Sequence, residues 1–179
     1  DSGYNLIIVL SGGNFNDLRC QTQKRLFKDL IDPVNLLPGV KGWHKTTTAL
    51  SDNSGDVGDE GWNPNWDSAN TNCLVVTKKN PTTLKKLRLW LQALISTLSH
   101  PVNMLLIDDE ADYASLNLLA HAKTIPKHAE KASRINKEIR LVLQCAERNA
   151  YIGFTASPFA NMFVPPFKDR LKDISGKHI

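Results

Sequence analysis

The sequence predicts an α/β protein, a three-layer sandwich in which a mainly parallel β-sheet lies between two layers of helices. Four short apolar runs rich in Ile, Val and Leu are continuous rather than alternating, and small or polar residues follow each of them. Such runs are typical of strands that are buried on both faces of a parallel sheet. Helical patterns separate the runs, and strands that alternate with helices form such sandwiches through right-handed crossovers.

The elements can be placed in chain order. The predicted strands are Leu6–Leu10, Leu74–Thr77, Met104–Ile107 and Tyr151–Phe154. The predicted helices carry apolar residues at three- and four-residue steps, and they cover Phe15–Leu30 after the N-cap residue Asn14, Leu84–Leu98 after Pro81, and Ile135–Ala146. The chain of 179 residues is long enough for one domain with a sizeable core, so residues 1–179 are predicted to form a single domain.

A long polar loop is predicted at residues 39–72, which are rich in Gly, Asn, Asp and Ser. Its acidic part, residues 52–60, does not fit a calcium loop because Val57 stands where that loop needs glycine, so we interpret it as solvated. The three tryptophans of the loop are expected to pin it to the body of the domain. A second break in the pattern, residues 113–131, is expected to loop over a ligand crevice.

Composition excludes several classes of protein. No apolar run approaches the ~20 residues that span a bilayer, and no signal pattern is present, so we expect a cytoplasmic protein without a membrane partner. The three cysteines form no CxxC pair, which argues against a zinc knuckle or a disulfide framework. The net charge of +4 modestly favours a partner with a phosphate backbone. The chain opens at Asp1 without Met, so we expect a piece of a longer protein.

The most informative motif is an acidic loop at the end of the third predicted strand. Four carboxylates, Asp108, Asp109, Glu110 and Asp112, occur within five residues directly after the strand. Ligands of open parallel sheets bind just beyond the carboxyl ends of strands, and crowded carboxylates there favour a hard divalent cation. For phosphoryl transfer, Asp109 would hold Mg²⁺ through water and Glu110 would orient the attacking water. The alternative is that these acidic residues simply cap a following helix.

A second loop at the end of the neighbouring predicted strand strengthens the first interpretation. Thr155 and Ser157 follow Phe154, and small hydroxyl residues there can hydrogen-bond the acidic loop and sense a γ-phosphate. A plain Ser-Pro turn is the alternative for this segment alone. The two loops together, each closing a buried strand, are more specific than either one.

These residues resemble known motifs. LLIDDEAD is similar to the Walker B motif of superfamily 2 helicases, and GFTASP is similar to their motif III. The segments DDEADYASLN, YIGFTASPFANMFV and LSGGNFNDLRCQTQKRL together resemble the Z1 domain family, bacterial proteins described as endonucleases and built around a superfamily 2 ATPase. The resemblance runs from about Leu6 to Val164 and is weakest at residues 39–72. It implies a RecA-like fold and ATP hydrolysis coupled to nucleic acid, with DNA favoured, in restriction or defence.

The resemblance also implies roles for individual residues. Asp109 and Glu110 take the Mg²⁺ and water-activating roles, and Asp112 would contact Thr155 or Ser157. Candidate contacts to a nucleic-acid backbone, from the positions of strand-tracking motifs, are Arg19, Gln21, Thr22, Lys78 and Lys79. A solvated helix face or loop is the alternative for these residues, and for the two lysines we weigh it equally.

The chain departs from the family pattern in one respect. No G-x-x-x-x-G-K-[ST] phosphate-binding loop is present, so the chain is expected to be a partial RecA-like domain without the strand that carries this loop. Its partners would then include the rest of a parent chain, with that loop and a second motor domain. The chain alone is expected to be inactive toward ATP. The last strand would lack a neighbour, so the chain is expected to self-associate there or to cover this edge with another segment.

Two other functions compete with a motor. The acidic loop could be the metal centre of a DNA endonuclease, although two-metal nucleases usually collect carboxylates from several strands and no PD-(D/E)xK pattern is present. The domain could also be a non-catalytic interaction module. The presence of both Asp109 and Glu110 argues against a module, because a scaffold needs neither.

Overall fold

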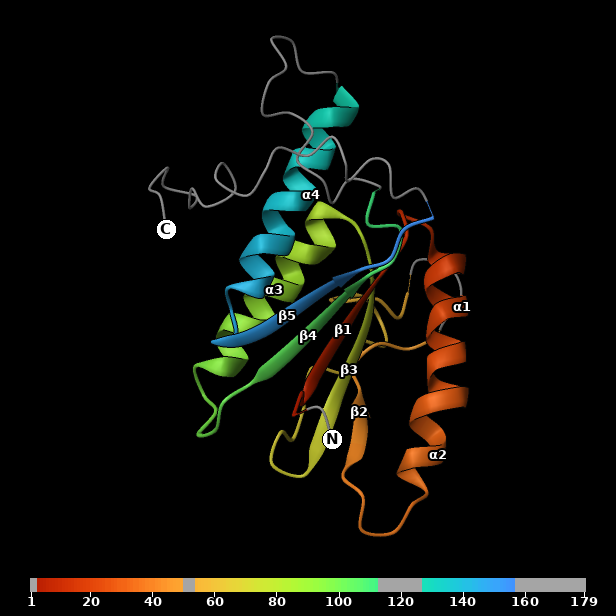
Figure 1. The fold of residues 1–179 in the computed structure, drawn as a ribbon, viewed down its shortest axis with the longest axis vertical. Helices are drawn as coiled ribbons and strands as arrows, with labels where there is room; N and C mark the ends of the chain where they lie inside the picture. The colour runs from red at the N-terminus through yellow and green to blue at the C-terminus, as the bar shows by residue number, and fades with distance from the viewer. Residues whose placement is uncertain (1–2, 50–53, 113–126, 157–179) are drawn as a thin grey trace.

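The computed structural model describes residues 3–49, 54–112 and 127–156, and these form a parallel sheet between two helical layers (Figure 1). The elements in chain order are β1 (Leu6–Ser11), α1 (Asn16–Leu26), the π-helical turn η1 (Phe27–Ile31), α2 (Asp32–Asn35), β2 (Gly42–Lys45), β3 (Thr71–Lys78), α3 (Pro81–Ile95), β4 (Asn103–Asp108), α4 (Lys127–Leu143) and β5 (Arg148–Gly153). The strand order is β2-β3-β1-β4-β5, and every pair is parallel. The predicted α/β sandwich is confirmed.

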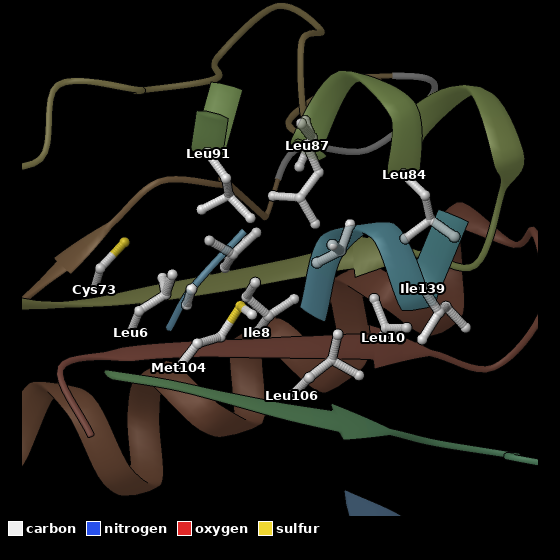
Figure 2. Close-up of a cluster of buried hydrophobic side chains, with 14 of the residues drawn as sticks. Leu6, Ile8, Leu10, Cys73, Leu84, Leu87, Leu91, Met104, Leu106 and Ile139 are labelled. Atoms are coloured by element: carbon white, nitrogen blue, oxygen red, sulfur yellow. The ribbon is translucent and has the colours of Figure 1, made fainter. Parts of the chain in front are cut away.

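The sheet is buried on both faces at its centre. Leu6, Ile8 and Leu10 of β1 are fully buried and belong to the larger apolar cluster, together with residues of α3 and α4 (Figure 2). Val9 belongs to the smaller cluster on the opposite face, with Ile31 of η1. Successive side chains of a strand point to opposite faces, so a strand buried on both sides reads as an unbroken apolar run.

Helix α3 shows how local sequence sets an element. Asn80 is the N-cap and its side chain accepts a hydrogen bond from Thr82 N at 2.8 Å, while Pro81 occupies the first turn, where no amide donor is needed. Leu84, Leu87 and Leu91 recur at helical spacing and are fully buried against the sheet. Burial of each such leucine contributes roughly 1.5–3 kcal/mol. In the described part of the chain, no helix is long and apolar enough to cross a membrane.

Strand β2 was not predicted. Its four residues, Gly42–Lys45, pair with β3 at the outer edge of the sheet, and each is only half-buried. An edge strand has one partner and one solvated side, so it carries no apolar run by which a sequence pattern could reveal it.

The acidic part of the 39–72 segment is only partly solvated, and the prediction is wrong for its buried residues. Asp56 and Val57 are buried, because Asp56 bonds to the carboxyl end of β3, whereas Gly58 and Glu60 are exposed. The expectation that tryptophans pin it is confirmed: Trp66 is 5% exposed, and Trp62 packs edge-to-face on Trp90 of α3 with ring centroids 5.2 Å apart. Trp43 packs on the smaller cluster.

The predicted loop over residues 113–131 lies mostly outside the described residues. Its last part, from Lys127, is the first turn of α4, so the helix begins earlier than its apolar pattern suggested. The polar composition of that turn hides it from a search for apolar periodicity.

The cysteines are free thiols, as expected. Burial raises the pKa of the Cys73 thiol well above its ordinary value. Burial also raises the pKa of Cys145, and the nearby Arg88 charge partly offsets that effect. Both thiols are therefore poor nucleophiles at neutral pH.

Strand β5 forms an edge of the sheet among the described residues. It pairs with β4 on one side, and Tyr151, Ile152 and Phe154 are 44%, 44% and 56% exposed. In the parallel register Ile152 lies beside Ile107 of β4. The helices α1 and α2 contact the other side of the sheet order, namely β1, β3 and β2. An apolar edge strand of this kind is a template for pairing with another strand.

We predict that the isolated chain self-associates through β5. Substitution Ile152→Lys places a charge on this edge and should shift the chain toward monomer, whereas Leu89→Lys, at an exposed leucine of α3, should leave association unchanged. Sedimentation velocity over a range of concentrations measures this. A monomer at every concentration, with rapidly exchanging β5 amides, would contradict both self-association and coverage of the edge by another segment.

Candidate functional site

The carboxyl ends of all the strands lie along one edge of the sheet, because every pair is parallel. Strands β1 and β4 are neighbours, and the helices that follow them, α1 and α4, lie on opposite faces (Figure 1). Ligands of open α/β sheets bind in the crevice at such a switch point. Gly12 and Gly13 follow β1 there, and the acidic loop, residues 108–112, begins at the last residue of β4.

The four carboxylates of the acidic loop have different environments. Asp108 is fully buried, Asp109 and Asp112 are half-buried, and Glu110 is exposed. Asp109 N donates to Leu10 O at 3.0 Å, so the loop remains attached to β1 beyond the end of the strand. Asp109 and Glu110 are thus presented to solvent at the switch point, while Asp108 points into the protein.

Glu110 has an unusual backbone. Its φ of 52° lies in the left-handed region, which few residues other than glycine adopt. Residues held there cost of order 1–3 kcal/mol and persist only when the surroundings fix them. The side chain of Glu110 lies against Gly12: a Cβ added to that glycine would stand 2.5 Å from Glu110 Cδ. The absence of a side chain at Gly12 therefore makes room for Glu110.

The loop that follows β5 is hydrogen-bonded to the acidic loop. Phe154 N donates to Asp108 O and Ala111 N donates to Phe154 O, each at 2.8 Å. Gly153 permits this approach, since a Cβ there would stand 2.9 Å from the Ala111 methyl. The half-buried Thr155 follows directly, and Ser157 lies outside the described residues. The two loops are thus adjacent, as sequence suggested, while a side-chain contact from Asp112 to either hydroxyl stays a prediction.

Lys79 lies among the loops rather than at the surface. It is 1% exposed, and its Nζ lies 2.8 Å from Asp108 Oδ1 and donates to Glu110 O at 2.7 Å. Tyr151 OH donates to Asp108 Oδ2 at 2.7 Å, so both carboxylate oxygens of Asp108 face a partner. Sequence indicated no function for Tyr151. The position of Lys79 does not support the predicted contact to nucleic acid.

Arg19 is also buried, at 0% exposed, and its partners are intramolecular. Its guanidinium donates to the carbonyl oxygens of Thr48, Ser54 and Gly55 at 3.0, 2.9 and 3.3 Å, and Nε lies 3.9 Å from Asp56 Oδ2. Its Nη1 also donates to Gln23 Oε1 at 2.6 Å, which continues the network along α1. Arg19 thus joins Thr48 and residues 54–56 to α1, which again differs from a surface contact to nucleic acid.

The remaining basic and polar candidates are placed differently. Lys78 Nζ lies 3.6 Å from Asp56 Oδ2, and its side chain is 12% exposed. Gln21 is exposed and Thr22 is half-buried on α1. Of the five predicted backbone contacts, Gln21 is therefore the most accessible, Thr22 and Lys78 are partly accessible, and Arg19 and Lys79 are enclosed.

The residues of the acidic loop fit a Mg²⁺ site in which water and phosphate oxygens supply some of the ligands. Mg²⁺ is usually bound through one or two carboxylates, with waters and phosphate oxygens completing its shell. Asp109 is half-exposed and offers oxygen of the right chemistry, whereas Asp108 is occupied by Lys79 and Tyr151. Within the described ranges, no three His, Cys, Asp or Glu side chains gather as a closed metal site. The donor set suits an open site completed by phosphate and water.

We predict that Arg19→Met lowers the free energy of unfolding by about 3–5 kcal/mol, because it leaves Asp56 and three carbonyl groups with fewer partners. The control is Arg25→Met, at an exposed position of the same helix, which should change stability by less than about 0.5 kcal/mol. Urea denaturation measures both variants. Unchanged stability together with weakened DNA binding would restore the surface role predicted from sequence.

Comparisons of the chain with family models, with curated proteins and with solved structures give no match.

Proposed function

We propose that this chain is part of a nucleic-acid-dependent ATPase, a helicase-like motor, and that it supplies the loops for Mg²⁺ and water at the site of ATP hydrolysis. One observation carries the proposal. The acidic loop after β4 and the loop after β5, which begins at Phe154 and carries Thr155, are hydrogen-bonded to each other at the carboxyl edge of a parallel sheet. Either loop alone has an ordinary structural explanation. The acidic loop also borders the switch point between β1 and β4, where ligands of open α/β sheets bind, and the second loop lies beside it.

The roles follow from the environments of the residues. Bound Mg²⁺ would neutralise charge on the phosphates and orient them. Asp109 would hold that ion through water, and the exposed carboxylate of Glu110 would accept a hydrogen bond from the attacking water and align it. Asp112 and Thr155 stand on the two joined loops and would link the state of the nucleotide to motion. These assignments extend the resemblance to superfamily 2 motifs.

The open edge of the sheet supports a partial motor domain. The resemblance implies a phosphate-binding strand beside β5. Among the described residues β5 pairs only with β4, and the side chains of Ile152 and of Phe154, which follows the strand, are exposed. Parallel sheets are normally covered on both faces, so exposed apolar side chains at β5 indicate a surface that another segment would cover. A strand and helix from elsewhere in a parent protein would fit at this edge, and the phosphates would then lie next to the acidic loop.

The nuclease alternative is less well supported. A metal centre made from all four carboxylates would need Asp108, whose two oxygens already face Lys79 and Tyr151. The Z1 family likeness still associates the parent protein with restriction or defence, so any DNA-cutting residues would lie elsewhere. DNA is the favoured partner, with Gln21 of α1 the most accessible of the candidate contacts.

The decisive experiment measures DNA-stimulated ATP hydrolysis by the complete protein that carries this chain. Glu110→Gln keeps the size of the side chain but removes its charge, so turnover should fall by about 100-fold or more. Glu147→Gln, the same change at an exposed position before β5, is the control and should leave turnover unchanged.

Two results would overturn the proposal. If the complete protein hydrolyses no ATP but cuts DNA with Mg²⁺ in a Glu110-dependent manner, the acidic loop is a nuclease centre. If neither reaction depends on Glu110, the domain is an interaction module.

A second variant tests the fit between Gly12 and Glu110. Gly12→Ala should fold, because the added methyl meets a flexible side chain rather than backbone, but it should displace the Glu110 carboxylate. Turnover should fall by about 10-fold or more, since small misplacements of catalytic groups are costly. The ATPase rate and the circular dichroism spectrum measure the two effects. An unchanged rate would show that Glu110 does not act from the position that its side chain has in this structure.

A further inference from the structure

We infer that Lys79 is a positioning residue for the hydrolysis loop, an inference that rests on the proposed function. The ammonium group of Lys79 forms an ion pair with Asp108 at 2.8 Å and donates a hydrogen bond to Glu110 O at 2.7 Å. These two residues flank the predicted Mg²⁺ residue, Asp109. A single buried cation therefore holds the loop on both sides of the residue that would meet the metal.

The left-handed backbone of Glu110 explains why the loop needs such an anchor. A φ of 52° is unfavourable for glutamate unless neighbouring contacts determine it. The peptide groups around Glu110 are fixed by three hydrogen bonds: its N–H donates to Asp109 Oδ1, its C=O accepts from Lys79, and Ala111 N donates to Phe154 O. Of these three, the bond from Lys79 is the one made by a side chain of another strand's loop.

The position of Lys79 is itself fixed from several directions. Its backbone N–H donates to Gly13 O at 3.1 Å, and the next residue, Asn80, donates from Nδ2 to Asn14 Oδ1 at 2.9 Å. Asn80 also caps α3, whose Leu84, Leu87 and Leu91 are buried in the core. The ammonium group is therefore attached to the body of the domain, and Tyr151 OH holds the far oxygen of Asp108.

Lys79 differs from an ordinary structural lysine in what it touches. A structural ion pair needs one partner, whereas this ammonium also bonds the carbonyl of the proposed catalytic glutamate. Lys79 would act through Glu110, by keeping the carboxylate where the water lies.

The test uses the complete protein and separates positioning from stability. Lys79→Met removes the charge, and kcat for ATP should fall by about 10- to 100-fold with KM for ATP unchanged within about twofold. The double variant Lys79→Met/Asp108→Asn removes both charges and should recover the urea midpoint without recovering kcat, because Glu110 O still lacks its donor. Lys85→Met, at an exposed position of α3, is the matched control.

Tyr151→Phe is a milder variant that keeps the ion pair and removes one hydrogen bond to Asp108, so it should fold and lower kcat less than Lys79→Met. Hydrogen exchange at the Ala111 amide gives a readout that needs no turnover, and exchange there should be faster in both the single and the double Lys79 variants.

The inference is overturned if the double variant recovers kcat together with stability, or if exchange at Ala111 is unaffected by loss of Lys79. Failure of the proposed function looks different, since the wild-type protein would then hydrolyse no ATP while the exchange result still reports on the anchor.

Discussion

The carboxyl edge of the sheet depends on one buried ion pair. Lys79 and Asp108 are both enclosed, and each would be costly to bury alone, because an unpaired charge loses its hydration without compensation. Together, with Tyr151 and the Glu110 carbonyl as further partners, they join the loop after β3, the acidic loop and strand β5. A buried ion pair is weak support for overall stability, since an apolar pair of similar volume often serves as well. Its consequence here is geometric: it gives the loops one arrangement.

The topology makes this pair possible. Strand β1 lies between β3 and β4, so Lys79 must reach across the end of β1, a span of about 10 Å for two strand spacings. Gly12 and Gly13 follow β1, and Gly13 O accepts a hydrogen bond from Lys79 N at 3.1 Å. The absence of a side chain at Gly12 makes room for the side chain of Glu110. The turn after β1 thus contacts both Lys79 and Glu110, which is why this short segment matters to the site without any functional group of its own.

The fold could be predicted from sequence further than the site could. Continuous runs such as Leu6–Leu10 identify buried strands because both faces need apolar side chains, and the parallel arrangement then places the acidic loop at the ligand edge. The identity of Lys79 and Arg19 as buried residues could not be predicted in this way. A lysine pair after a strand looks solvated, and its partner Asp108 lies 29 positions away, brought near only by strand order. Arg19 similarly depends on Thr48 and residues 54–56, which belong to a polar loop whose acidic part was expected in solvent rather than against the end of β3.

The distribution of charge within the acidic loop follows from these contacts. Four carboxylates in five residues would repel one another if all faced the same volume, and the structure avoids this by directing Asp108 inward to a cation and leaving Glu110 outward. The chain must reverse direction between them, and the left-handed turn at Glu110 accomplishes that reversal. A right-handed backbone there would carry the next peptide away from Phe154 and break the bond from Ala111 N to Phe154 O, one of the two that join the loops. The strained residue is therefore the link between an inward-facing anchor and an outward-facing carboxylate, and the proposed chemistry occurs at the point where that strain is held.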